Sequence, residues 1–153
     1  FSVDGDCNFF VSRSYKSNYR KYMNPSVSRD IIFNHLYLDF DSDLTIVEGV
    51  FDAIVAGENS VPLLGSSLRD ESRLFQEIVK NDTPVYIALD SDVEKKSMRM
   101  ISNLLKYDIE VYKVDIAPYS DVGEMTKEEF IIRKENSTLM NTHNYLLTKI
   151  ANI

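Results

Sequence analysis

Two hydrophobic runs that each end in carboxylates constrain this chain more than any other feature. Residues 44–47 are followed directly by Glu48, and residues 85–89 are followed by Asp90 and Asp92. Short runs of β-branched and large apolar residues predict buried strands. In open α/β sheets, ligands bind at the carboxyl ends of the strands. The two motifs therefore predict a sheet that delivers acids to its binding edge.

If the two strands are neighbours, Glu48, Asp90 and Asp92 form one cluster. Carboxylates so close together do not all stay ionised unless a cation neutralises them. Hard oxygen ligands in this number suit Mg²⁺ or Mn²⁺ better than zinc. The sequence thus predicts a divalent-metal site that acts on a phosphate-containing substrate, with these three acids as catalytic and metal-binding residues.

Each acid also has a plainer explanation. Glu48 could be an acid that the helix dipole favours at the start of a helix, and Asp90 could be an ordinary loop acid. Asp92 could cap the helix that follows it, which does not exclude a metal contact. Asp52 lies one helical turn after Glu48 and can face the same side. Asp121 and Glu124 follow the next predicted strand, so they are two more acids expected at the same edge.

The hydrophobic pattern predicts strands that alternate with helices. The run at 85–89 is the expected central strand, and the run at 109–114 is expected nearer the sheet edge. Thr126 and Glu129 form a capping-box pattern. Short loops between alternating strands and helices predict a mostly parallel α/β sheet with right-handed crossovers. The expected strands are 44–47, 60–64, 85–89 and 109–114, and the expected helices are 50–56, 70–80, 93–106, 127–133 and 141–150.

The segment ahead of these strands differs in composition. An Asp-Gly turn at residues 4–5 predicts a hairpin that pairs 1–3 with 8–11, and residues 12–28 are expected to form extended loops or short strands. Residues 11–29 hold five basic residues and no acidic one, whereas residues 36–153 hold 12 basic and 21 acidic residues, a net charge of −9. A basic segment on an acidic body indicates a local contact with a phosphate backbone. A solvated face with incidental lysines is the plainer alternative.

A turn within the basic segment combines Lys21, Tyr22 and Asn24. The cation can bind phosphate, and the Tyr or Asn could stack on or hydrogen-bond a nucleotide. The Tyr could equally be a packed loop aromatic. His35 and His143 have no partners at metal-ligand spacing, and we predict a structural role for both.

Bulk properties exclude several classes of protein. The 153 residues are enough for one ordinary domain. A single cysteine, Cys7, indicates no disulfide framework and a reducing compartment. No apolar run approaches the ~18 residues that cross a bilayer, and no signal-peptide pattern opens the chain. We therefore predict a cytoplasmic protein with no membrane contact. Because the chain begins at Phe1, apparently within a strand, we expect it to be part of a longer protein.

Taken together, the motifs resemble the TOPRIM domain, which primases, topoisomerases and some nucleases share. That family has a Glu after its first strand and an Asp-x-Asp after its third, which here match Glu48 and the pair Asp90 and Asp92. The Glu-Gly-x-x-Asp motif at residues 48–52 and the Lys-Tyr-x-Asn-Pro motif at 21–25 resemble motifs of bacterial and phage replicative primases of the DnaG type. In those primases a basic subdomain directly precedes the TOPRIM sheet, an order that disfavours topoisomerases.

The resemblance covers roughly residues 8–135 and implies a domain organisation and a site. Residues 1–40 would be the C-terminal part of a small basic α+β subdomain, 41–135 the TOPRIM domain and 136–153 a C-terminal helical segment. Asp52, Asp121 and Glu124 would be additional metal ligands or would support the ligands. The residues implied in nucleotide and template binding are Arg13, Lys21, Tyr22, Asn24 and Arg29.

The sequence departs from the primase pattern at two places. His-Lys-Gly-Arg commonly precedes the Leu-Tyr pair at the subdomain junction, whereas Ile32-Phe33-Asn34-His35 stands here, so that lysine is missing; Arg29 could compensate. Many members also have a Gly in the turn after Asp-x-Asp, where this chain continues with Val93 and Glu94. Such drift suits a divergent phage enzyme.

The function that the resemblance implies is metal-dependent, template-directed synthesis of short RNA primers for DNA replication. Two Mg²⁺ or Mn²⁺ ions, a single-stranded DNA template and ribonucleoside triphosphates would take part. The zinc-binding domain and the region that contacts the replicative helicase are not expected in this chain, so no zinc is expected. A TOPRIM nuclease that activates water with the same acids is one alternative. A non-catalytic nucleic-acid-binding module is another.

Overall fold

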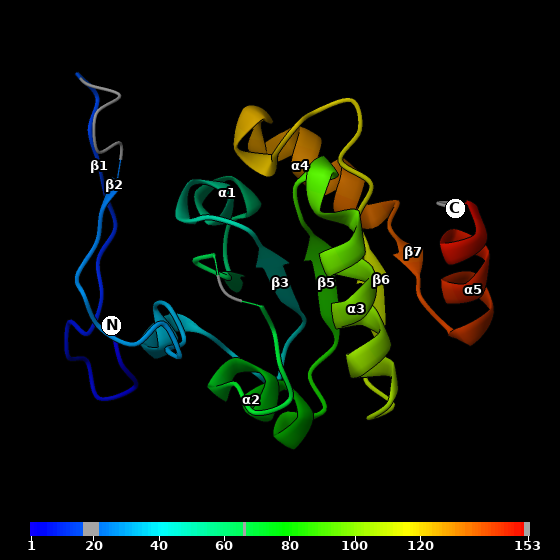
Figure 1. The fold of residues 1–153 in the computed structure, drawn as a ribbon, viewed down its shortest axis with the longest axis horizontal. Helices are drawn as coiled ribbons and strands as arrows, with labels where there is room; N and C mark the ends of the chain where they lie inside the picture. Colours follow the sequence, from blue (N-terminus) through cyan, green and yellow to red (C-terminus); the bar gives the residue numbers. More distant parts are fainter. Residues whose placement is uncertain (17–21, 66, 152–153) are drawn as a thin grey trace.

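A five-stranded, mostly parallel sheet forms the centre of the molecule (Figure 1). The computed structural model describes residues 1–16, 22–65 and 67–151. The strand order is β4-β3-β5-β6-β7, with parallel pairing from β4 to β6 and an antiparallel last pair. The fold is therefore the α/β class that the sequence predicts, with β5 as the central strand. The strands are β3 (Leu44–Val47), β4 (Ser60–Pro62), β5 (Val85–Ala88), β6 (Val111–Lys113) and β7 (Thr138–Leu139).

Helices cover both faces of this sheet. One hydrophobic core joins the sheet to α2 and α3 and includes Phe75, Ile78 and Ile101. The second core lies on the opposite face and includes Phe130 from α4, with Ala53 of α1 packed against it. Residues of β3 and β5 are buried on both faces, which explains why their sequences are mainly apolar, with Thr45 as the buried polar residue of β3. The helices are α1 (Val50–Ala56), α2 (Arg73–Asn81), α3 (Glu94–Leu105), α4 (Lys127–Glu135) and α5 (Thr142–Ala151).

Three 3₁₀ turns complete the described elements: η1 (His35–Tyr37), η2 (Ser91–Val93) and η3 (Val122–Glu124). The predicted capping box of α4 is present, because Thr126 Oγ1 accepts from the Glu129 N–H and Glu129 Oε2 accepts from the Thr126 N–H. Within the described ranges, no helix is long and apolar enough to cross a membrane.

The hairpin predicted around residues 4–5 is wrong. A turn does form there, closed by the Ser2 N–H to the Asp6 carbonyl at 2.8 Å, but no strands flank it. Strand pairing occurs instead between β1 (Ser12–Arg13) and β2 (Tyr22–Met23), which form a separate antiparallel ribbon (Figure 1). Ser12 Oγ also donates to the Met23 carbonyl at 2.6 Å. The prediction of short strands within 12–28 is confirmed for the residues that the structure describes.

Smaller differences concern element ends. Helix α2 begins at Arg73 rather than at residue 70, because residues 70–72 form a turn in which Ser72 Oγ donates to the Arg69 carbonyl. The Arg73 N–H then donates to Asp30 Oδ1 at 3.0 Å, which fixes the start of the helix against the N-terminal segment. Strand β7 was not predicted, because two residues are too short to show a period of two.

Candidate active site

The carboxyl ends of three adjacent strands each lead into an acidic loop. Strands β3 and β5 are paired with Val47 opposite Ala88, so the following residues, which include Glu48 and Asp90, leave the sheet at the same edge. Strand β6 pairs with the other side of β5, and the chain beyond it reaches Asp121 at the start of η3. This edge is where open parallel sheets bind ligands.

A cavity of about 750 Å³ opens at this edge. Its acidic lining residues are Glu48, Asp52, Asp90, Asp121 and Glu124. They come from the segments that follow β3, β5 and β6, with Asp52 in the first turn of α1 and Glu124 in η3. Facing them are residues of the N-terminal segment, so one hollow combines an acidic wall with a basic and aromatic wall. The second wall consists of Arg13, Tyr22, Asn24, Arg29 and, from α1, Phe51.

Asp52 ties two of the acidic loops together. Its side chain is 8% exposed, its Oδ2 accepts from the Gly49 N–H at 2.7 Å and its Oδ1 accepts from the Gly123 N–H at 3.0 Å. A Cβ on Gly123 would lie 3.0 Å from Asp52 Oδ1 and 3.2 Å from Asp121 Oδ1, so a larger residue here would have to push one of these carboxylates away by a few tenths of an ångström. Burial raises the pKa of the Asp52 carboxyl, and the two backbone hydrogen bonds oppose that shift. Asp52 thus fixes the start of α1 to η3.

Glu48 is held by a lysine that sequence analysis missed. Lys96 Nζ, from the first turn of α3, lies 2.7 Å from Glu48 Oε1 and 3.0 Å from Oε2. Both side chains are about three-quarters shielded, at 24% and 23% exposure, so this ion pair is screened less than a surface pair. Among the described cations, Lys96 is the one that forms an ion pair with these acids. It supplies one positive charge at the place where a cation is expected.

Among these acids, Asp90 has the environment that most favours a bound cation. Its Oδ1 is buried and, within the described part of the chain, has no hydrogen-bond partner. Burial raises the pKa of its carboxyl to about 6, and the charges of Asp52, Glu48, Asp121 and Asp92 act in the same direction. A buried, unpaired carboxylate oxygen beside other acids is the environment that a divalent cation would relieve.

The structure brings only some of the predicted residues together. Asp92 lies on η2, is exposed and does not line the cavity. Tyr22, Asn24 and Arg29 do line it, and Arg29 also donates to the Leu64 carbonyl at 3.4 Å. Lys21 lies outside the described residues.

Arg13 links the N-terminal ribbon to the sheet domain. Its guanidinium carbon lies 5.6 Å from the ring centre of Tyr22 and 5.5 Å from that of Phe51. The Tyr22 contact lies within the ribbon, and the Phe51 contact, worth roughly 0.5–1 kcal/mol at an exposed site, joins the ribbon to the start of α1. The ribbon therefore forms one wall of the cavity instead of projecting freely from the sheet.

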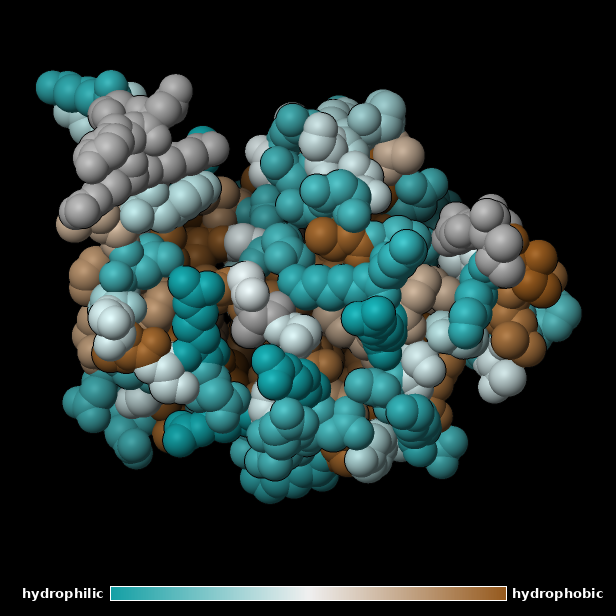
Figure 2. Space-filling view, in the orientation of Figure 1, coloured by the Kyte–Doolittle hydropathy of each residue, from teal (hydrophilic) through white to brown (hydrophobic). Residues whose placement is uncertain are grey.

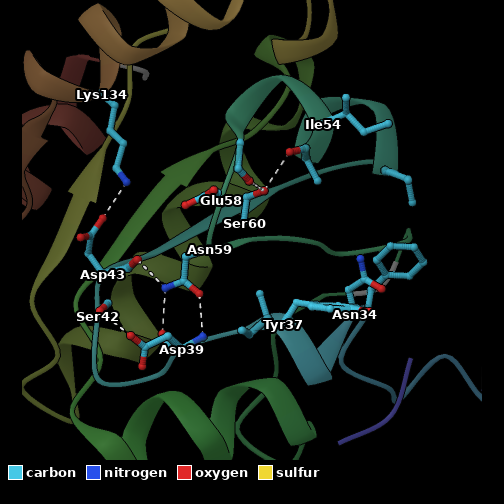
Figure 3. A pocket seen from close by; sticks show the side chains of 15 residues that line it. Asn34, Tyr37, Asp39, Ser42, Asp43, Ile54, Glu58, Asn59, Ser60 and Lys134 are labelled. Carbon is cyan, nitrogen blue, oxygen red and sulfur yellow. Dashed lines mark hydrogen bonds and ion pairs between the residues drawn. The ribbon is translucent and has the colours of Figure 1, made fainter. Parts of the chain in front are cut away.

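A larger hollow of about 910 Å³ lies at the amino ends of β3 and β4 (Figure 3). Several of its polar groups pair with one another: Asn59 Nδ2 donates to the Asp39 and Asp43 carbonyls, and Lys134 Nζ lies 2.6 Å from Asp43 Oδ2. Ser60 Oγ likewise donates to the Ala53 and Gly57 carbonyls at the end of α1. The hollow at the carboxyl edge is smaller, but it holds the unsatisfied acid.

The oxygen donors at the carboxyl edge suit a hard divalent cation. Glu48, Asp90 and Asp121 are the acids that could hold one, because Asp52 already uses both oxygens on backbone donors. Among residues 1–16, 22–65 and 67–151, no three His, Cys, Asp or Glu side chains are already arranged as a metal-ligand set. A bound cation would have to draw these acids together and displace or share Lys96.

Fold and site together define a parallel α/β domain with a cluster of acids at the carboxyl edge of its sheet, faced by a basic N-terminal segment. The sequence matches no protein-family model and no curated protein sequence. Among solved structures, the chain is similar to the primase of Aquifex aeolicus, in a crystal structure of its zinc-binding and RNA polymerase domains. The TM-score is 0.70 and the identity 24%, over 91% of this chain and 39% of that chain. The chain thus shares its fold with part of that primase and spans about two fifths of its length.

Proposed function

We propose that this chain is part of the catalytic core of a DnaG-type DNA primase and that its sheet is a TOPRIM domain. The observation that carries the proposal is the single cavity in which Glu48, Asp90 and Asp121 face Arg13 and Arg29. Acids that hold divalent cations, opposite cations that hold phosphates, are what nucleotidyl transfer requires. The fold shared with the Aquifex aeolicus primase supports the same conclusion.

In the proposed reaction the two walls have different tasks. Glu48, Asp90 and Asp121 hold Mg²⁺ or Mn²⁺, and Asp92, on η2 outside the cavity, is a further carboxylate near Asp90. Bound cations would neutralise the triphosphate and help to deprotonate the attacking 3′-hydroxyl. Arg13 and Arg29 bind phosphates of the ribonucleoside triphosphate or the single-stranded DNA template, and Tyr22 and Asn24 contact the nucleotide.

The test is metal-dependent synthesis on a gel. The protein is incubated with end-labelled single-stranded DNA, labelled ribonucleotides and Mn²⁺ or Mg²⁺, and EDTA serves as the control. We expect short RNA products that require the metal and all four ribonucleotides. Shortening of the labelled DNA in place of RNA synthesis would contradict the proposal and assign a nuclease. DNA binding with neither product would assign a non-catalytic binding module.

Exchange of Lys96 for methionine tests whether the lysine stands where the metal binds. Lys96→Met removes the ammonium that contacts both Glu48 oxygens but keeps the apolar stem. We expect the variant to bind Mn²⁺ several-fold more tightly, because the cation no longer competes with Lys96. In EDTA its melting temperature should fall by a few degrees, because Glu48 then stands unpaired among acids. Titration followed by electron paramagnetic resonance of free Mn²⁺ and a thermal melt give the two readouts.

A matched control for this experiment is Lys113→Met. Lys113 Nζ lies 2.5 Å from Glu94 Oε1, and its exposure is close to that of Lys96. Its ion pair is outside the cavity, so its removal should leave the Mn²⁺ affinity unchanged. If Lys96→Met weakens Mn²⁺ binding as the Glu48→Gln variant does, the lysine supports the metal and does not compete with it.

A further inference from the structure

A second hollow, of about 450 Å³, lies between residues 67–69 and α3. We call it the α3 groove. Four cationic side chains line it, and none of the described residues that line it is acidic. Figure 2 shows that the face over α3 carries many hydrophilic side chains, and Figure 1 shows that α3 lies on the near side of the sheet. The four cations are Arg69, Lys95, Lys96 and Arg99. Their convergence is unexpected in a region whose net charge is −9.

Positive charge is electrostatically unfavourable at the positions that the cations of the α3 groove occupy. Lys95 and Lys96 lie in the first turn of α3, where the helix dipole disfavours positive charge. Lys95 and Arg99 are four residues apart on the same helix, an arrangement in which like charges repel by a few tenths of a kcal/mol. Neither has an ion-pair partner in the part of the chain that the structure describes. An anion in the groove would reverse each of these costs.

Nearby acids do not neutralise these cations. Glu94 pairs with Lys113, and Asp70 accepts from Asn103 Nδ2 at 3.1 Å. Within the described residues, the one ion pair between a groove cation and an acid outside the active site joins Arg69 to Glu71, at 3.7 Å between side chains that are 70% and 73% exposed. Such exposed pairs contribute little. Among the residues that the structure describes, Lys95 and Arg99 therefore carry charges that no ion pair neutralises, whereas Lys96 pairs with Glu48.

The floor of the α3 groove is apolar. Leu68, Val93 and Met100 line it, and Leu68 and Met100 are almost fully buried. A cationic rim around an apolar floor suits a ligand with phosphates on one side and flat, weakly polar bases on the other. Bases present their faces in a single strand, whereas in a duplex they are stacked inside. The chemistry of the groove thus favours single-stranded nucleic acid over a duplex.

The α3 groove is continuous with the active site through Lys96. That side chain lines the groove, and its ammonium reaches Glu48 at the acidic wall. A strand that leaves the active site past Glu48 would therefore meet Lys96 first and then Lys95 and Arg99.

From these observations we propose that the α3 groove binds the phosphate backbone of single-stranded nucleic acid, as a strand-binding site additional to the basic N-terminal wall. This proposal rests on the proposed function for its placement of the strand beside the active site. It assigns a role to Arg69, Lys95 and Arg99, which lie outside the cavity that holds the acids.

The double variant Lys95→Ala/Arg99→Ala tests the proposal. Its binding to a fluorescein-labelled oligodeoxynucleotide is followed by fluorescence anisotropy over a range of NaCl concentrations. For a single strand, each lost phosphate contact reduces the magnitude of the slope of log K against log salt by about 0.7. We expect the magnitude of this slope to fall by about 1.4 and the affinity at 0.1 M NaCl to fall at least tenfold. Both substituted side chains are exposed, so the fold should remain intact.

The matched control is Lys80→Ala/Lys127→Ala, which removes the same charge from exposed positions away from the α3 groove. It should leave the slope within 0.3 of the wild-type value if contacts, and not net charge, set the slope. Equal losses in both double variants would overturn the proposal. So would a loss of Mn²⁺-ATP binding in Lys95→Ala/Arg99→Ala with unchanged DNA binding, because the groove would then hold a triphosphate.

Failure of this proposal differs from failure of the proposed function. A wild-type protein that makes RNA while the Lys95→Ala/Arg99→Ala variant keeps its full salt slope excludes the α3 groove alone. A protein that makes no RNA, but whose DNA binding is weakened only in that variant, retains the groove and loses the primase assignment.

Discussion

An Asp90→Asn variant is expected to lose metal-dependent RNA synthesis by a factor of about 10³ or more while its folded state becomes more stable in EDTA. The two effects have one cause. Asp90 combines a buried oxygen that lacks a partner, within the described residues, with four neighbouring acids that raise its pKa in addition to burial. The negative charge that would hold a cation therefore destabilises the folded state when no cation is bound.

The size and pH range of the stabilisation follow from the pKa of Asp90. Because the folded-state pKa is raised from 3.8 to about 6, ionised Asp90 destabilises the folded protein. The cost develops as pH rises from 3.8 to about 6 and is complete above that value. Two pKa units correspond to at most about 3 kcal/mol, and solvent screening of this partly exposed side chain reduces the expected gain to about 1 kcal/mol. The gain should be present at pH 7.5 and absent at pH 3.5.

Thermal melts in EDTA at these two pH values, together with the primer-synthesis gel at pH 7.5, measure both effects. Glu135→Gln is the control, because it removes an exposed carboxylate at the end of α4, away from the cavity. It should change neither readout. An Asp90→Asn variant that is less stable than wild type at pH 7.5 would show that Asp90 has a favourable partner. Retained synthesis would exclude Asp90 from the active site.

Much of the sheet could be predicted from the sequence because its signals are local. The run at 44–47 is apolar on both faces and is followed by a helix flanked by Gly49 and Gly57, so β3 and α1 have the predicted bounds. Short strands within residues 12–28 are predicted, but their pairing as β1 with β2 is not, and β7 is not predicted at all. Each of these strands has two residues, too few to show a period of two, and β7 pairs with a strand remote in the chain. The Asp-Gly turn points instead to a hairpin that does not form.

The residues of the candidate site likewise divide into those that local sequence signals reveal and those that depend on distant partners. Strand-end acids such as Glu48 and Asp90 can be found from the sequence, because parallel strands bring their carboxyl ends to one edge. The Lys96–Glu48 ion pair joins residues 48 positions apart and was missed. A signal was available: Val93, Lys96, Met100 and Leu104 follow three- and four-residue steps, so the lysine lies on the core-facing stripe of α3. A charge in that position requires a partner.

Asp52→Ala is expected to destabilise the protein by about 3 kcal/mol, the largest stability effect that the site predicts. The substitution removes the acceptor for two backbone donors, Gly49 N–H at the start of α1 and Gly123 N–H in η3. Hydrogen bonds to a charged group contribute roughly 1.5–3 kcal/mol each. Removal of a carboxylate whose pKa burial raises recovers part of that loss.

Comparison within the acidic cluster separates hydrogen bonding from charge. Asp121→Ala removes the same charge but only one backbone contact, Glu124 N–H to Oδ1 at 3.0 Å, so it should cost about 1 kcal/mol or less. Asp52→Asn keeps one acceptor oxygen and should fall between the two. Urea unfolding monitored by circular dichroism measures all three free energies of unfolding. If Asp52→Ala is as stable as wild type, repulsion among the acids outweighs the link between α1 and η3, and Asp52 is then free to join Glu48 and Asp90 as a metal ligand.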